Sequence, residues 1–284
     1  MTPRALLQTA IARLKAAGIP EPARDARLLL AHALTLPADR LTLHLDDPLP
    51  AGAETRLEAA LHARAARQPV SQILGHRLFW GRAFQVTPDV LDPRPETEIL
   101  ITAALDEPFA RVLDLGTGSG AILLTLLAER PGARGVGIDR SEPALAVAGT
   151  NAAALGLTAR ADLRHSDWFA AVEGRFDLIV SNPPYLARAE MAALAPETRD
   201  WEPAGALEGG DDGLDAYRAI AAGAGAHLAP GGRLILEIGP TQRAAVTEIL
   251  HAAGLGPVIC CADFDGRDRV LLARDASPRP PRAG

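Results

Sequence analysis

The stretch RVLDLGTGSGA, residues 111–121, is the strongest indicator of fold in this chain. A short run rich in apolar residues is followed by three glycines within residues 116–120, and an apolar segment of helical length comes directly after them. Glycine allows the chain to turn tightly and lets a ligand approach the main chain at the start of a helix. The stretch therefore predicts a strand, a ligand-binding turn and a helix, which is the repeating unit of a parallel sheet.

The alternation of strand and helix continues from this stretch toward the C-terminus. Strands are expected near residues 111–115, 134–139, 160–164, 176–181 and 233–238, and helices near 119–129, 142–154, 213–228 and 241–253. Residues 257–263 and 268–274 flank a turn at 264–267 and predict a closing hairpin. We therefore expect an α/β fold with a seven-stranded, mostly parallel, Rossmann-like sheet.

The part of the chain before this region has a different character. Apolar spacing predicts helices near residues 3–17, 21–35 and 51–67, which form a small bundle with no evident catalytic constellation. Residues 76–86 predict a β-hairpin that turns at Gly81, and a proline-stiffened connector leads from it into a helix near 96–105. The expected domains are a helical N-terminal domain at 1–72, a hairpin and linker at 73–95, the α/β domain at 96–275, and a proline-rich flexible tail at 276–284.

Composition narrows the class of protein. With 48% hydrophobic and 23% charged residues and no apolar stretch long enough to span a membrane, the chain is expected to be cytoplasmic and to have no membrane partner. Its formal net charge of −6 argues against a protein that wraps bare nucleic acid. The only cysteines, Cys260 and Cys261, are adjacent and fit neither a disulfide nor a CxxC site, so no metal is expected.

The glycine-rich turn and the strand that follows it predict a cofactor site. Asp139 ends that second strand, about the distance onward at which an acidic residue can bind a ribose hydroxyl pair. Together the two features indicate an adenosine-containing cofactor, and a merely tight turn is the weaker interpretation. The pattern Gly116-x-Gly118-x-x-Ala121 also fits the loose dinucleotide motif of dehydrogenases, so it does not choose the cofactor by itself.

Three further residues suit S-adenosylmethionine better than a dinucleotide. S-adenosylmethionine has no pyrophosphate, and its site needs an acceptor for an ammonium group. Asp114, at the lip of the glycine turn, can help through its charge or by organising the turn. After the third strand, Asp167 can accept a hydrogen bond from the adenine amine and Trp168 can pack on the adenine face. The alternative for this pair is an exposed helix cap followed by a core tryptophan.

The candidate catalytic residues are Asn182, Pro183, Pro184 and Tyr185, which directly follow the strand at 176–181. Open α/β sheets place ligands at this end of their strands, and two prolines make the tip rigid. A planar NH₂ group is a poor nucleophile, so a site that accepts both of its N–H bonds, at the Asn182 side chain and the Pro183 carbonyl, can orient it while Tyr185 stacks on it. Orientation toward a sulfonium methyl can contribute roughly 7–11 kcal/mol. The alternative is a purely structural turn.

These motifs resemble known enzymes. Residues 114–120 with Asp139 are similar to the core of class I S-adenosylmethionine-dependent methyltransferases, and Asn-Pro-Pro-Tyr is similar to the motif of enzymes that methylate planar NH₂ groups. The stretches at 94–98 (RPETE) and 202–218 (EPAGALEGGDDGLDAYR) resemble the peptide chain release factor glutamine N5-methyltransferases, the HemK/PrmC type. The resemblance covers nearly the whole chain.

The resemblance implies an enzyme that acts in translation termination. It would convert S-adenosylmethionine to S-adenosylhomocysteine while methylating the side-chain amide of the Gly-Gly-Gln glutamine in class 1 release factors, as a monomer, without direct nucleic-acid contact. We expect the N-terminal domain to recognise the substrate protein. The implied cofactor contacts are Gly116, Thr117, Gly118, Ser119, Gly120, Asp139, Trp168 and Asn182. The implied substrate contacts are Asn182, Pro183, Pro184 and Tyr185, with Arg94 and Glu96 near the site mouth.

Departures from the family pattern and rival functions complete the prediction. Ser71, Gln72 and Asp92 depart from the pattern, which bears on domain packing and partner docking rather than on the reaction.

A sibling enzyme that methylates a ribosomal protein glutamine is the nearest alternative. A DNA or RNA amino-methyltransferase fits the acidic balance and the 4% aromatic content less well. A dehydrogenase would need a hydride-handling group, and a binding-only scaffold would not need the intact tip.

Overall fold

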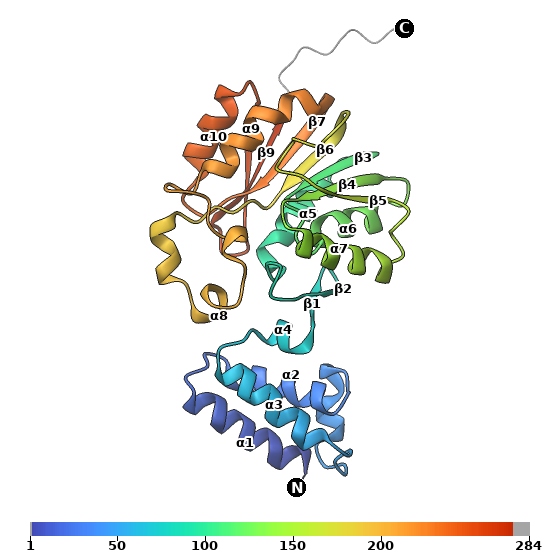
Figure 1. The fold of residues 1–284 in the computed structure, drawn as a ribbon, viewed down its shortest axis with the longest axis vertical. Coiled ribbons are helices and arrows are strands. Elements are labelled where there is room, and N and C mark those ends of the chain that lie inside the picture. Colours follow the sequence, from blue (N-terminus) through green and yellow to red (C-terminus); the bar gives the residue numbers. More distant parts are fainter. Residues whose placement is uncertain (1, 275–284) are drawn as a thin grey trace. The chain divides into compact units, whose positions relative to one another are not determined.

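The computed structural model describes residues 2–274, which form two compact units (Figure 1). One unit contains residues 2–76 and Ala195–Trp201, and the other contains Arg77–Leu194 and residues 202–274. The chain therefore passes between the units three times. The tail predicted at 276–284 lies outside the described residues.

The first unit is helical, as predicted for this part of the chain. Helices α1 (Pro3–Ala16), α2 (Pro22–Ala33) and α3 (Ala53–Ala65) match the three expected segments, and the structure adds η1 (Ala38–His44) and α4 (Val70–Leu74). Leucines from α1, α2, η1 and α3 share one apolar core, which stabilises the bundle.

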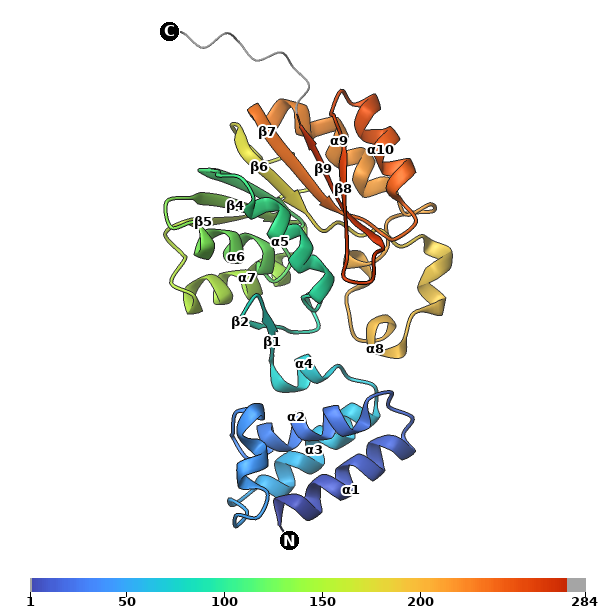
Figure 2. The ribbon, with the colours of Figure 1, turned by 180° about the vertical axis from the view of Figure 1, so that it is seen from behind.

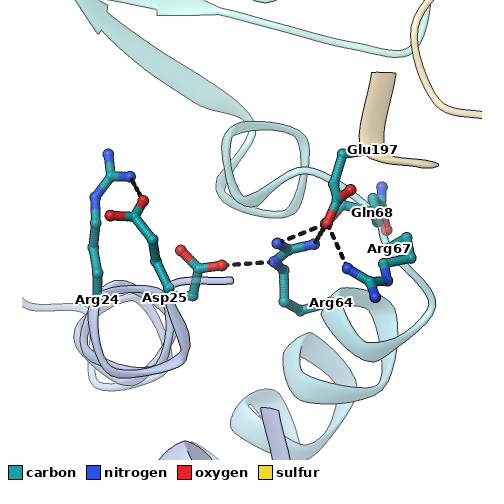
Figure 3. Close-up of polar contacts among 7 residues, drawn as sticks. Arg24, Asp25, Arg64, Arg67, Gln68 and Glu197 are labelled. Carbon is teal, nitrogen blue, oxygen red and sulfur yellow. Dashed lines mark hydrogen bonds and ion pairs between the residues drawn. The ribbon is translucent and has the colours of Figure 1, made fainter. Parts of the chain in front are cut away.

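A buried ion cluster attaches residues 195–201 to this bundle (Figure 3). Arg64 of α3 donates from Nε to Oδ2 of Asp25 on α2 at 2.7 Å, and its Nη1 lies 3.1 Å from Oε1 of Glu197 on α8 (Pro196–Arg199). Arg67 binds the same Glu197 oxygen at 3.2 Å. Asp25, Arg64 and Glu197 have only 8%, 7% and 20% of their side-chain surface exposed. The short segment is thus held by charges shielded from water.

The predicted departures at Gln72 and Asp92 have contacts within their own units. In the first unit, Gln72 Nε2 donates to the main-chain oxygen of Trp201 at 2.9 Å, so it also holds the 195–201 segment. In the second unit, the buried Asp92 lies 3.6 Å from the guanidinium of Arg77, which compensates its charge. Both residues have polar partners suited to their positions.

The second unit begins with the predicted hairpin. Strands β1 (His76–Phe79) and β2 (Arg82–Gln85) form a two-stranded sheet that turns at Trp80 and Gly81, both with positive φ. The chain continues through η2 (Pro95–Thr97) into α5 (Glu98–Leu105).

The main sheet has seven strands in the order β5-β4-β3-β6-β7-β9-β8, which confirms the predicted fold class. The first five strands in this order pair in parallel, whereas β9 is antiparallel to β7 and to β8. The strands are β3 (Arg111–Leu115), β4 (Arg134–Asp139), β5 (Ala161–His165), β6 (Phe176–Ser181), β7 (Leu228–Glu237), β8 (Ile259–Ala262) and β9 (Asp268–Arg274). β7 starts five residues before the predicted strand at 233–238, because its early residues pair with β6 across a register shift.

Helices cover both faces of this sheet (Figure 2). On β3, Val112 packs with α5 and α6 (Ala121–Glu129), while the next residue, Leu113, packs with α9 (Asp215–His227) and α10 (Arg243–Ala252). This alternation is what a strand buried on both faces requires. Helix α7 (Glu142–Ala154) packs on β4 and β5. Across residues 2–274, every helix is too short or too polar to cross a bilayer.

The topology brings the predicted motifs to one edge. Strands β3, β4, β5, β6 and β7 run parallel, so their last residues lie at the same edge of the sheet. The glycine turn, Asp167–Trp168 and the Asn182–Tyr185 tip follow β3, β5 and β6, and Asp139 is the last residue of β4. This is the edge where α/β sheets place their ligands.

Candidate cofactor and substrate site

A cavity of about 330 Å³ lies at this edge of the second unit, at the lower end of the range typical of ligand sites. Predicted site residues that line it are Arg94, Gly116, Thr117, Gly118, Ser119, Asp139, Asp167, Trp168, Asn182 and Pro184. Predicted residues outside its lining are Asp114, Gly120, Glu96, Pro183 and Tyr185. Lining residues that the sequence did not single out include Phe79, Val90, Thr97, Arg140, Ser166 and Gly205.

The glycine turn leaves its main chain open to the cavity. Gly116, Gly118 and Gly120 all have positive φ, at 69°, 55° and 80°, a conformation that other residues rarely adopt. A Cβ at Gly116 or Gly118 would meet no atom within 4 Å, whereas one at Gly120 would lie 2.9 Å from Leu124 of α6. The first two glycines therefore give a ligand access to the backbone, and the third allows the turn to pack against the helix.

Asp139 is fixed at the end of β4 by two backbone donors. Its Oδ2 accepts the Gly118 N–H at 2.9 Å and its Oδ1 accepts the Ser141 N–H at 2.9 Å. Each carboxylate oxygen keeps a second lone pair, and the residue faces the cavity. The arrangement suits a pair of neighbouring hydroxyl donors, as on a ribose.

Asp114 lies beneath the turn rather than in the cavity. The residue is fully buried, and its Oδ2 accepts from the Thr117 hydroxyl at 2.7 Å and from the Leu123 N–H at 3.2 Å. Burial raises the pKa of Asp114 to about 7, although both hydrogen bonds oppose this. Its Oδ1 is buried and has no hydrogen-bond partner within residues 2–274. Of the two predicted roles, this geometry favours organising the turn.

The segment after β5 holds Trp168 in an unusual backbone conformation. Trp168 has a φ of 46°, which is costly for a bulky residue and is often associated with functional sites. The Ser166 hydroxyl donates to the Trp168 carbonyl and accepts from the Ala171 N–H, both at 2.9 Å, and so stabilises the turn. Trp168 and Asp167 both line the cavity, where they can contact an adenine ring.

The tip after β6 is held on both sides. The Ser181 hydroxyl donates to the Leu115 carbonyl at 2.6 Å, which ties the start of the tip to β3. Gln242 Nε2 donates to the Tyr185 carbonyl at 2.9 Å, which fixes the other end. Asn182 Nδ2 donates to the Thr97 hydroxyl at 3.3 Å. Neither Asn182 Oδ1 nor the Pro183 carbonyl oxygen accepts a hydrogen bond from any residue in the described part of the chain.

Tyr185 and the predicted mouth residues differ in their surroundings. Tyr185 packs on the core beside α9 and α10, and burial raises the pKa of its hydroxyl. Arg94 binds both carboxylate oxygens of the buried Glu202, at 2.7 and 2.6 Å. Glu96 is exposed. Arg94 thus anchors the chain segment at 203–206, part of which lines the cavity, whereas Glu96 has no such contact.

Sequence reasoning missed Thr97, Glu237 and Gln242. Thr97 belongs to the RPETE stretch, which gives it no role of its own, and Glu237 lies in the apolar run RLILEI, where an acid inside a buried strand is the signal that could identify it. Gln242 gave no signal, because its partners Tyr185 and Gly213 are distant in the sequence.

Comparison with known proteins identifies the class of this chain. Residues 5–75 match the family model described as PrmC N-terminal domain, and residues 90–197 match the one described as Methyltransferase small domain. The chain resembles in fold the crystal structure of a methyltransferase from Pyrococcus furiosus, with a TM-score of 0.55, 19% identity, and coverage of 78% of this chain and 98% of that one. The fold, the glycine turn and the matched models define a class I S-adenosylmethionine-dependent methyltransferase.

Curated relatives narrow the class to one family. The chain is 67% identical to the release factor glutamine methyltransferase of Cereibacter sphaeroides, over 94% of this chain and 96% of the relative. It is 50% identical to the protein of the same name from Rhodospirillum rubrum, over 97% and 86% of the two chains. The chain belongs to the release factor glutamine methyltransferase family.

The residues at the cavity fit the cofactor of this family. At Gly116 and Gly118 the turn exposes its main chain to the cavity, because a Cβ there would meet no atom within 4 Å. The Asp139 carboxylate has lone pairs left to accept hydrogen bonds from ribose hydroxyls. Asp114 lies beneath the turn and outside the cavity, so it supports the fit by organising the turn rather than by contacting the cofactor. S-adenosylmethionine, which carries no phosphate and bears positive charge, suits this set of acceptors.

Proposed function

We propose that this protein transfers a methyl group from S-adenosylmethionine to the side-chain amide nitrogen, N5, of the glutamine in the Gly-Gly-Gln motif of peptide chain release factors. Relatives named for this activity align with nearly the whole chain. The observation that carries the proposal is that Asn182, whose side-chain oxygen accepts no hydrogen bond from residues 2–274, lines the same cavity as the glycine turn and Asp139.

The cofactor is bound by three strand ends in this proposal. S-adenosylmethionine supplies an electrophilic sulfonium methyl. Asp139 holds the ribose hydroxyls, the backbone at Gly116–Gly118 contacts the amino acid end, and Trp168 packs on the adenine while Asp167 accepts from its amine. These groups bind and orient, and none of them needs to change its protonation state.

The tip orients the substrate amide. Asn182 Oδ1 and the Pro183 carbonyl accept the two amide N–H bonds, whereas Tyr185, predicted to stack on the amide plane, lies outside the cavity lining and packs on the core, so it supports the tip from behind. The tip would hold the amide nitrogen in line with the methyl group that the cofactor supplies, and the amide proton lost on methylation would pass to Asn182 or water. The barrier is lowered mainly by alignment, for which roughly 7–11 kcal/mol is available in favourable cases.

The partner and setting follow from the substrate. We propose that the enzyme acts as a monomer in the cytoplasm, where release factors are found, and contacts no nucleic acid directly. The helical domain predicted at 1–72 recognises the release factor, since it carries no catalytic constellation of its own. We further propose that residues 73–95 are a hairpin and linker and that residues 96–275 are the methyltransferase domain.

A methylation assay with labelled cofactor tests this function. The wild-type protein is offered a release factor, the same factor with its Gly-Gly-Gln glutamine changed to alanine, a ribosomal protein and nucleic acid, and labelled peptides are mapped. We expect label only on the Gly-Gly-Gln glutamine. Label on a ribosomal protein glutamine instead would establish the sibling activity, and label in nucleic acid alone would refute protein methylation. Calorimetry with S-adenosylmethionine and with NAD separates the two cofactor classes.

A further inference from the structure

Two buried side chains behind the tip form a hydrogen-bonded chain with Asn182. Thr97 ends η2 and Glu237 ends β7, and they are 4% and 1% exposed. Asn182 Nδ2 lies 3.3 Å from Thr97 Oγ1, and Thr97 Oγ1 lies 2.7 Å from Glu237 Oε2. Thr97 reaches the cavity lining, whereas Glu237 does not. The chain therefore leads from the buried end of β7 to the candidate catalytic amide.

While Glu237 is ionised, the hydrogen bonds that link Glu237, Thr97 and Asn182 can have only one donor-to-acceptor direction. A carboxylate accepts hydrogen bonds and donates none, so the single Thr97 hydroxyl proton points to Glu237. The Thr97 oxygen then has only lone pairs left for Asn182, and it accepts from the amide nitrogen. If the Asn182 amide turned over, two acceptor oxygens would face each other. These hydrogen bonds therefore keep the Asn182 NH₂ group toward Thr97 and the Asn182 oxygen away from it.

We propose that Thr97 and Glu237 are positioning residues that set the amide orientation of Asn182, so that its oxygen, rather than its nitrogen, faces the substrate. This inference rests on the proposed function, because a substrate NH₂ group needs an acceptor. An asparagine that presented its own NH₂ group would oppose the substrate donor with a second donor. The rigid Pro183–Pro184 backbone fixes where the side chain starts, but it does not choose between the two ends of the amide.

The surroundings of Glu237 balance its charge. Burial raises the pKa of Glu237 to about 7, while the Thr97 hydrogen bond and the charge of Arg269 favour the ionised form. The ionisable groups around it are Arg94, Glu96, Arg269, Tyr185 and Tyr217. Assays at about pH 8 keep Glu237 mainly ionised, so that the direction of the chain is defined during the test.

The test compares three threonine variants in the full chain, with a release factor as substrate. Thr97→Val keeps the shape of the side chain but removes the hydroxyl, Thr97→Ser keeps the hydroxyl, and Thr102→Val makes the same change on α5, where the hydroxyl bonds only the Glu98 carbonyl. We expect Thr97→Val to lower kcat about tenfold or more, because it removes the hydrogen bond that orients Asn182. The Kd for S-adenosylmethionine, measured by calorimetry, should be unchanged. Thr97→Ser should restore most of kcat, and Thr102→Val should match wild type.

Two results would overturn the inference. One is wild-type kcat in Thr97→Val. The other is an equal loss in Thr97→Val and Thr97→Ser, which would show that the methyl group and packing matter rather than the hydroxyl. Either result leaves the proposed function intact if wild-type protein still labels the Gly-Gly-Gln glutamine, so the two proposals fail separately.

Discussion

Replacing Arg64 by methionine should destabilise the helical unit strongly. Methionine fills much of the volume of the arginine stem but cannot pair with a carboxylate. The change leaves Asp25, whose side chain is 8% exposed, without the guanidinium that binds it at 2.7 Å. Removing one partner of a buried pair typically costs about 3–5 kcal/mol. Glu197 keeps Arg67 at 3.2 Å and is more exposed, so it should add little to this cost.

Hydrogen exchange gives the cleanest measurement of this loss. The two units need not unfold together, so a single melting curve of the full chain does not isolate the first unit. Exchange of slowly exchanging amides in α2 and α3 reports the opening free energy of that unit directly, and it should fall by about 3–5 kcal/mol in Arg64→Met. Amides of the central strands β3 and β6 should keep their protection.

Two further variants control this experiment. Arg13→Met breaks the pair with Glu58, whose side chain is 65% exposed, and should change the exchange of α2 and α3 far less. Asp25→Leu combined with Arg64→Met removes both buried charges and should recover part of the stability. Most of the loss in Arg64→Met comes from the Asp25 carboxylate, which that change leaves buried without its partner. The reasoning is wrong if Arg64→Met exchanges like Arg13→Met, or if the double variant is less stable than Arg64→Met.

Three other predictions concern the cavity. Asn182→Ala should abolish turnover yet keep most of the affinity for S-adenosylmethionine in calorimetry, because its main task is orienting the substrate; wild-type turnover would contradict the mechanism. Gly118→Ala, at a φ of 55° on the cavity wall, should weaken cofactor binding at least tenfold, judged by calorimetry, with a melting temperature that falls only slightly. Burial raises the pKa of Asp114 to about 7, so the folded state holds a proton that the unfolded state releases, and this contribution to stability is lost as pH rises toward about 7. Asp114→Asn should therefore gain melting temperature relative to wild type as pH rises from about 4 to about 7, and a difference independent of pH would argue against the raised pKa.

The sheet could be predicted because its strands are apolar runs with clear ends. Strands β3, β4, β6 and β9 have the predicted limits, since glycine, proline or charged residues stop each run. The segment at 195–201 could not be assigned to the helical unit in the same way. Its attachment depends on Glu197 meeting Arg64, a residue 133 positions earlier, and both look like ordinary surface charges in the sequence.

The residues of the candidate site also divide into those that the sequence predicts and those that it does not. The glycine turn, Asp139, Trp168 and Asn182 could be brought together in advance, because parallel strands end at one edge and each motif follows a strand directly. Thr97 and Glu237 could not, since their roles depend on a hydrogen bond between residues 140 positions apart. Motifs tied to strand ends are readable from sequence, whereas the side chains that support them depend on tertiary packing.

In the proposed mechanism, the support behind the tip lets an asparagine orient the substrate without a general base. Pro183 and Pro184 have no N–H, so the tip cannot be held by ladder hydrogen bonds, and Ser181 and Gln242 hold its two ends instead. With its ends fixed, the tip keeps the Pro183 carbonyl free of partners within residues 2–274, and in the proposed arrangement the hydrogen bond to Thr97 orients the Asn182 oxygen away from Thr97. A pair of fixed acceptors can align a planar NH₂ group without removing its proton first. Catalysis by alignment alone therefore requires that the groups behind the acceptors be as fixed as the acceptors themselves, which is why a buried hydroxyl and a buried carboxylate are expected to matter for kcat.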